Sequence, residues 1–182
     1  MSATAATLES RIARLEHVEQ IQTLKSRYHT AINDTRFDEV GALFTEDAFL
    51  HLGYLMPSEE PIVGRDAIAR GFASMKSNAT QSQVKQFLHS HIVELTAHDA
   101  ARGTGILLAF YGVRDESYFV SGRYDEEYRL VEREWLFSRM TLALYFTVPL
   151  QLGWAGHKRH YLINSGQPVP AYPELLPNPA VA

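Results

Sequence analysis

The sequence contains no cysteine in its 182 residues. Disulfide bonds, thiol nucleophiles and thiolate metal ligands are therefore excluded. The absence of cysteine is typical of a reducing compartment, so we expect a cytoplasmic protein. Stability must come from an apolar core, and 46% of the residues are apolar. A chain of this length can bury a sizeable core within one domain.

A strongly basic region is also missing. The net charge is −4, and no run of lysine and arginine is longer than two residues. Nucleic acids and anionic membranes both require a basic footprint, so we expect neither as a partner. No apolar run reaches the ~20 residues of a membrane-spanning helix. The first residues lack the basic and apolar regions of a secretory signal.

Signatures of bound cofactors are absent as well. Gly103-Thr104-Gly105 lies inside a predicted strand and lacks the rest of a dinucleotide fingerprint. His89-x-His91 has no carboxylates near it at the usual ligand spacing. The sequence therefore predicts a protein with no metal site and no cofactor.

The sequence does contain a long amphipathic pattern near its start. From Leu8 to Ile32, apolar residues recur every three or four positions. This spacing predicts one long helix with a single buried face. A second, short helix is expected over Phe37–Phe44, and a third from Gly64 to Met75.

Residues with β propensity dominate the second half of the chain. The predicted strands are Ala48–Tyr54, Gln86–Thr96, Ala101–Val113, Tyr118–Val131 and Trp135–Val148. Helices followed by a meander indicate an α+β fold. We predict a cone-shaped barrel, with about three helices packed on a strongly curved, mixed but mostly antiparallel sheet that encloses a pocket. This domain spans residues 1–152, and the proline-rich tail 153–182 is a lid, a dimer arm or a disordered segment.

Several motifs resemble the SnoaL-like proteins of the nuclear transport factor 2-like superfamily, in the same order and spacing. They are Leu24-Lys25-x-x-Tyr28, Phe37-Asp38-x-x-x-x-Leu43-Phe44, Asp47-Ala48, Gly64-Arg65-Asp66-Ala67-Ile68 and Gly122-Arg123-Tyr124-x-x-x-Tyr128. Within the superfamily, the likeness is greatest to bile acid 7α-dehydratases and hexachlorocyclohexane dehydrochlorinases, most clearly at Tyr145-Phe146-Thr147-x-Pro149-Leu150. The resemblance implies a buried pocket and cofactor-free elimination, isomerisation or cyclisation of an apolar molecule.

The resemblance also implies an acid/base dyad, and here the sequence departs from the family. The family carries a His or Asp five residues after the helix-one tyrosine and a His on the first long strand. Counting from Tyr28 gives Asn33 for the first position, and anchoring the strand on Ile92-Val93-Glu94-Leu95 gives Gln86 for the second. An amide has no proton equilibrium near neutral pH, so these two side chains can orient a substrate but cannot act as a base.

Other titratable groups lie close to the dyad positions. Asp34 is one residue beyond Asn33, and it acts either as a base or as a turn residue. His89 and His91 are two residues apart, so we expect them to share one face of a strand. We assign the acid/base role to His89, with His91 as a substrate-binding residue; both are alternatively hydrogen-bonded strand histidines. Tyr28 keeps the family residue and is either a donor to a developing oxyanion or a packed core tyrosine.

Aromatic side chains on the strands complete the predicted site. Tyr54, Phe110 and Tyr145 are expected to line a pocket suited to a ring-containing ligand. Asp125-Glu126-Glu127 is interpreted as a solvated strand segment. We expect a homodimer or homotrimer packed through the outer face of the sheet. The predicted function is a cofactor-independent lyase or isomerase acting on an apolar small molecule; the alternatives are a non-catalytic binding protein or an assembly subunit.

Overall fold

The computed structural model describes residues 7–55, 60–77, 81–113 and 116–155. The α-helices are α1 (Leu8–Asn33) and α2 (Arg65–Ser77), and three one-turn 3-10 helices are η1 (Phe37–Glu39), η2 (Gly41–Leu43) and η3 (Gly53–Leu55). The strands are β1 (Phe44–His51), β2 (Ile62–Val63), β3 (Gln81–Leu95), β4 (Ala100–Val113), β5 (Glu116–Val131) and β6 (Glu134–Pro149). In this part of the chain, no helix is long and apolar enough to cross a membrane.

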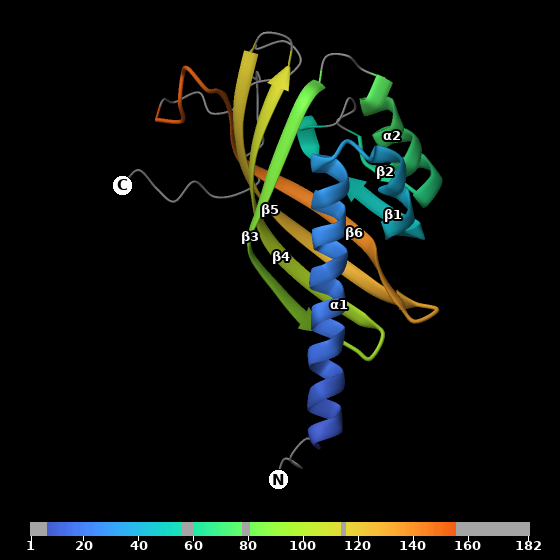
Figure 1. The fold of residues 1–182 in the computed structure, drawn as a ribbon. Coiled ribbons are helices and arrows are strands. Elements are labelled where there is room, and N and C mark those ends of the chain that lie inside the picture. The colour runs from blue at the N-terminus through green and yellow to red at the C-terminus, as the bar shows by residue number, and fades with distance from the viewer. Residues whose placement is uncertain (1–6, 56–59, 78–80, 114–115, 156–182) are drawn as a thin grey trace.

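The strands form one six-stranded sheet in the order β2-β1-β6-β5-β4-β3. All neighbours are antiparallel except β1 and β6, which are parallel. The helices lie over one face of the sheet, and α1 crosses in front of its long strands (Figure 1). The sheet is not closed, because β2 and β3 remain at its edges. The predicted α+β fold, with helices packed on a mixed and mostly antiparallel sheet, is confirmed.

The long predicted helix is confirmed, but only its second half is buried. Thr7 caps α1 by accepting a hydrogen bond from the Ser10 amide, and Asp34 is the C-cap. The buried side chains begin at Ile21, and they include the polar residues Lys25 and His29. The first apolar residues of the stripe are exposed: Leu8 by 66%, Ile12 by 46% and Leu15 by 68%. α1 therefore projects beyond the sheet at its N-terminal end (Figure 1).

The second predicted helix, Phe37–Phe44, is wrong in detail. The segment forms two separate 3-10 turns, and β1 begins at Phe44, four residues before the predicted strand. Gly41 explains the break: a Cβ there would lie 2.6 Å from Ala69 Cβ on α2. The glycine lets η2 approach α2 closely, and glycine also weakens a continuous α-helix.

The four long strands lie where the sequence predicts them, except that β3 begins earlier. Gln81–Lys85 joins the strand because these residues pair with β4 near Val113. Sheet pairing here outweighs the low β propensity of the residues. The two-residue strand β2 was not predicted. The tail prediction for residues 153–182 lies mostly outside the described residues.

A β-bulge in β3 decides which side chains face the helices. His89 pairs with Ile106 and Ile92 pairs with Thr104, so Ser90 and His91 together oppose the single residue Gly105. Ser90 has a positive φ of 51°. One extra residue reverses the alternation of side chains along a strand. His89 therefore lies on the outer face, whereas His91 lies on the inner face that packs against α1.

Candidate functional site

A buried ion pair joins α1 to the inner face of β5. Lys25 Nζ donates to Glu126 Oε1, and both side chains are 0% exposed. Lys25 is on the buried face of α1, one turn before Tyr28. Glu126 alternates with Tyr124 and Tyr128 along β5, and all three are buried. The prediction that Asp125–Glu127 is a solvated segment is therefore wrong at its central residue, because the Glu126 side chain lies on the inner face of the strand.

The surroundings of this pair act on the charged forms of both groups. Lys25 Nζ lies 3.4 Å from the ring centroid of Tyr124 and 5.0 Å from that of Tyr28, and both rings stabilise a cation. Burial lowers the pKa of Lys25, and the attraction of Glu126 opposes that shift. Burial alone would raise the pKa of Glu126, but the Lys25 charge and the hydrogen bonds to this carboxylate lower its pKa to about 2.

Tyr128 and His91 extend the pair into a hydrogen-bonded relay. The Tyr128 hydroxyl donates to Glu126 Oε2, and His91 Nε2 lies 3.0 Å from the Tyr128 oxygen and 3.4 Å from Glu126 Oε2. Burial, and then the Glu126 charge, raise the pKa of Tyr128 well above its ordinary value, so the phenol keeps its proton. Lys25, Glu126, Tyr128 and His91 are called the inner relay below.

The relay fixes the tautomer of neutral His91. Tyr128 has one proton and donates it to Glu126, so the Tyr128 oxygen must accept from His91 Nε2–H. The lone pair of neutral His91 is then on Nδ1. This atom is buried and has no hydrogen-bond partner among the described residues. The His91 side chain is 7% exposed. The arrangement provides a proton acceptor whose opposite nitrogen is held by a tyrosine and a carboxylate.

A second buried histidine lies beside the relay on α1. His29 is 6% exposed, and within the described part of the chain neither ring nitrogen meets a partner in good hydrogen-bond geometry. Burial, and then the Lys25 charge, lower its pKa to about 3. His29 is therefore neutral near pH 7. It is a weaker base than an ordinary imidazole, since its protonated form would be destabilised by the neighbouring ammonium.

The two predicted dyad positions come together, as a structural clamp. Asn33 Nδ2 donates to the Gln86 carbonyl (2.9 Å), and Asn33 Oδ1 accepts from the Gln86 amide (2.6 Å). The Lys85 ammonium also donates to the Asn33 carbonyl. The carboxamide thus binds the free edge of β3 as a neighbouring strand would. The Gln86 side chain points inward and its Nε2 donates to the Tyr111 hydroxyl (3.1 Å).

The other predicted site residues are separated. The expectation that His89 and His91 share a face is wrong, because of the bulge at Ser90. Asp34 lies at the end of α1 with its side chain 56% exposed and paired with Arg36 at 3.4 Å, so it does not face the sheet interior. Tyr28 is fully buried, and its ring packs edge-on against five aromatic rings: those of His29, Phe44, Phe72, Tyr124 and Phe137. Burial raises its pKa, so Tyr28 keeps its proton.

Of the three residues of the predicted aromatic lining, Phe110 is on the other side of the sheet. Phe110 is 43% exposed on the outer face, and Tyr145 is the extra residue of a bulge between Leu144 and Phe146. The side chain of Tyr54 lies outside what the structure describes. Phe110 belongs to a row of rings with centroids 5.2–6.1 Å apart. This outer aromatic patch consists of Phe87, Phe110, Phe119, Phe146 and Trp154.

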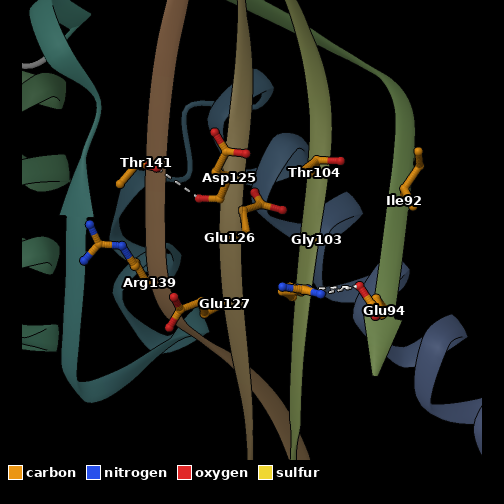
Figure 2. A pocket seen from close by; sticks show the side chains of 10 residues that line it. Ile92, Glu94, Gly103, Thr104, Asp125, Glu126, Glu127, Arg139 and Thr141 are labelled. Carbon is orange, nitrogen blue, oxygen red and sulfur yellow. Dashed lines mark hydrogen bonds and ion pairs between the residues drawn. The ribbon is translucent and has the colours of Figure 1, made fainter. Parts of the chain in front are cut away.

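A hollow of about 260 Å³ lies on the same outer face, further along the strands. Figure 2 shows Asp125, Glu127 and Arg139 around it, with Glu94 on the far strand bound to Arg102. Three other hollows lie at the surface around α1, α2 and the β5–β6 turn, the largest of about 900 Å³. His91, His29 and Tyr28 line none of these four. The outer hollow is a charged depression of the sheet surface, and Glu126 is the one member of the inner relay among its lining residues.

The fold and its polar interior define a class: α+β proteins in which helices cover one face of a curved sheet. Residues 13–141 match the family model of the SnoaL-like domain, and the chain belongs to that family. This confirms the family resemblance drawn from the sequence. Among curated proteins, none matches the chain.

Solved structures with the same fold include proteins named after elimination enzymes. A protein of Novosphingobium aromaticivorans, provisionally named a scytalone dehydratase, has a TM-score of 0.69 and 17% identity over 90% of this chain and 99% of that one. Hexachlorocyclohexane dehydrochlorinase LinA-type3 from Novosphingobium barchaimii has a TM-score of 0.66 and 18% identity over 78% and 94%. A third, provisionally named an aromatic ring hydroxylase, from N. aromaticivorans, has a TM-score of 0.62 and 26% identity over 80% and 96%.

Sequence reasoning missed most of the inner relay. The sequence identifies Lys25 only as part of a motif, and Glu126 only as part of a charged run. One signal was available: Tyr124, Glu126 and Tyr128 alternate on a predicted strand, so a buried Tyr128 requires a buried Glu126. No such signal shows on which face of the sheet His91 lies, because nothing in the sequence marks Ser90 as a bulge.

The Asn33 clamp leads to a stability prediction. Asn33→Ala removes two hydrogen bonds and leaves the Gln86 backbone groups unpaired, so the free energy of unfolding should fall by about 1–3 kcal/mol. Asp34→Ala is the matched control, because it changes an exposed neighbour and should cost less than about 0.5 kcal/mol. Urea denaturation of the two variants measures the difference. Equal stabilities would show that the clamp contributes nothing.

The buried ion pair leads to a second prediction. Lys25→Met or Glu126→Leu alone leaves an unpaired buried charge and should lower the free energy of unfolding by about 3–5 kcal/mol. The double variant Lys25→Met/Glu126→Leu removes both charges and should recover most of that loss. A double variant as unstable as the sum of the two singles would contradict the expected coupling.

The pH dependence of stability isolates Glu126. Its folded pKa of about 2 lies below the ordinary 4.5, so its stabilising contribution is complete above pH 4.5 and is lost as the pH falls toward 2. The free energy of unfolding, measured from pH 6 down toward pH 2, should therefore decline more steeply in the wild type than in the double variant. Parallel curves would argue that the pair does not favour the ionised carboxylate.

Proposed function

We propose that this protein is a cofactor-independent lyase or isomerase that acts on an apolar, ring-containing small molecule. Membership of the SnoaL-like family supports this class, as do structural neighbours named as a dehydratase and a dehydrochlorinase. The observation that carries the proposal is His91: its Nδ1 is buried and unpartnered among the described residues, while Tyr128 and Glu126 hold its Nε2.

In the proposed reaction, a local movement of the edge strand β3 exposes His91 Nδ1, which is buried in the structure, and this atom accepts a proton from a carbon of the substrate. The electron pair of the broken C–H bond forms a double bond, which either expels a leaving group or displaces an existing double bond. The imidazolium that results is stabilised by the Glu126 carboxylate 3.4 Å away and by the Tyr128 oxygen. Return of the proton to the leaving group or to another carbon restores neutral His91.

The choice of His91 over the other candidates follows from charge. No described carboxylate forms an ion pair with His29, and its pKa of about 3 disfavours the protonated form. Asp34 is exposed and paired with Arg36. The amides of Asn33 and Gln86 cannot accept a proton near neutral pH. His91 lies on the inner face of the sheet, and the Glu126 carboxylate beside it stabilises its charged form. Tyr28 and Gln86 remain proposed as groups that orient the substrate.

A generic elimination substrate tests this assignment without knowledge of the natural one. The probe is 5-nitrobenzisoxazole, an apolar bicyclic molecule that opens to a coloured nitrophenolate when a base removes its ring proton. We expect the wild type to accelerate this reaction above buffer, and His91→Ala to lose at least ~10²-fold of that acceleration. His89→Ala, which changes a histidine of the outer face, should retain it.

His98→Ala is an additional control, because His98 is 91% exposed in the β3–β4 turn. Circular dichroism and thermal unfolding establish that each variant is folded. A folded His91→Ala protein with full activity would overturn the assignment, as would loss of activity in His89→Ala alone. Absence of any wild-type acceleration would argue against an available base.

A non-catalytic assembly or binding role is the second candidate function. The outer aromatic patch favours it, because Phe87 and Phe110 are 48% and 43% exposed on an otherwise ordered sheet face. Exposed aromatic clusters of this kind mark surfaces that bind partners. The two amides at the usual dyad positions are also compatible with a protein that has no catalytic role.

The patch leads to a prediction about self-association. We expect a homodimer or homotrimer packed through the outer sheet face, and Phe110→Lys should shift it toward the monomer because it places a charge among apolar rings. Sedimentation velocity at micromolar concentration measures the change. Ile12→Lys is the matched control, since Ile12 is equally exposed but lies on the projecting end of α1. A monomeric wild type would contradict the prediction.

A further inference from the structure

Two glycines interrupt the inner face of β4 opposite the inner relay. Gly103 and Gly105 alternate with Ala101 and Leu107 on this face, and all four are buried. Glycine weakens a strand interior, because it adds backbone freedom and no packing. Two in alternation therefore require a physical reason, which is the close approach of another group.

The groups that approach the two glycines differ. A Cβ on Gly103 would lie 3.0 Å from Tyr128 Cε2, 3.2 Å from the Tyr128 hydroxyl and 3.1 Å from the Ile92 carbonyl. A Cβ on Gly105 would lie 2.9 Å from Leu88 Cδ1 and 3.6 Å from His91 Cδ2. At Gly105 the only tight neighbour is the end of a flexible side chain, and His91 is at ordinary contact distance.

The two positions should therefore respond differently to a methyl group. Next to Gly105, Leu88 can rotate its terminal methyl away. At Gly103 the Ile92 carbonyl is backbone within the sheet, so the new methyl cannot move toward it. The displacement must fall on the ring and hydroxyl of Tyr128, which is itself packed against Phe137 with ring centroids 5.2 Å apart.

We propose that Gly103 is a positioning residue for His91, acting through Tyr128. The absence of a side chain at Gly103 lets the Tyr128 phenol lie against the β4 backbone, where its oxygen is 3.0 Å from His91 Nε2. This contact keeps the proton on Nε2 and the lone pair on Nδ1. The inference rests on the proposed function, in which His91 Nδ1 accepts the substrate proton. Gly105 has no such role.

The direct readout is the tautomer of neutral His91, which the ¹⁵N chemical shifts of its two ring nitrogens report without any substrate. In the wild type we expect Nε2–H as the single form at alkaline pH. Tyr128→Phe removes the nearer accepting oxygen and leaves only Glu126 Oε2 at 3.4 Å, so the preference for Nε2–H should weaken toward a mixture of the two tautomers. Gly103→Ala should give a similar mixture, whereas Gly105→Ala should keep the wild-type spectrum.

A double-mutant cycle separates positioning from a general loss of structure. In a Tyr128→Phe background the relay contact is already gone, so Gly103→Ala should cause no further change in the His91 spectrum. If Gly103→Ala does not fold, the double variant Gly103→Ala/Tyr128→Leu replaces the ring by a smaller side chain and should restore folding. Failure of that double variant would show that the Ile92 carbonyl, and not Tyr128, requires the glycine.

Activity on 5-nitrobenzisoxazole is a second, independent test of this inference. Gly103→Ala should lower kcat by about 10-fold or more with little change in KM, because misplacement of a catalytic group affects the chemical step. A wild-type tautomer in folded Gly103→Ala overturns the inference even if His91 proves catalytic. The expected tautomer pattern with no activity in any protein would instead support the positioning of His91 and argue against the proposed function.

Discussion

The interior of this protein depends on one interaction, the ion pair between Lys25 and Glu126. It joins the long helix to the central strand β5 and leaves neither charge in contact with water. Two charges buried in this way must satisfy each other, and their neighbours must satisfy the remaining donors and acceptors. The second carboxylate oxygen is therefore available to Tyr128, and through Tyr128 to His91. The rings of Tyr124 and Tyr28 surround the ammonium.

Much of the fold could be predicted from the sequence, because it depends on periodicity. The apolar residues of α1 recur with the period of a helix, and the second half of the chain is rich in residues with β propensity. Both patterns can be recognised in the sequence alone. The errors occurred where tertiary contacts outweigh local preference, as at Gly41, where α2 packs too closely for a continuous helix. The candidate site was harder to predict from the sequence. Its members come from α1, β3 and β5, and the parity of His91 depends on a single extra residue at Ser90.

The two positions at which the sequence predicts a dyad, Asn33 and Gln86, form a structural contact. Asn33 and Gln86 do meet, as the family resemblance implies, but the contact is between a carboxamide and a backbone. It ties the end of α1 to an edge strand. Because both side chains are amides, this contact at the end of α1 contains no titratable pair, whereas His29 and Lys25 lie one and two turns earlier on the same helix.

The position of β3 at the edge of the described sheet has a consequence for the inner relay. Glu126 lies on the central strand β5, which pairs with both β4 and β6, whereas His91 is carried by a strand that pairs with β4 alone. Local opening of a protein begins where the fewest backbone bonds must break. Fraying of β3 would therefore carry the imidazole away while the ion pair stayed intact. The Lys25–Glu126 ion pair and the His91 imidazole thus belong to parts of the molecule with different freedom to move.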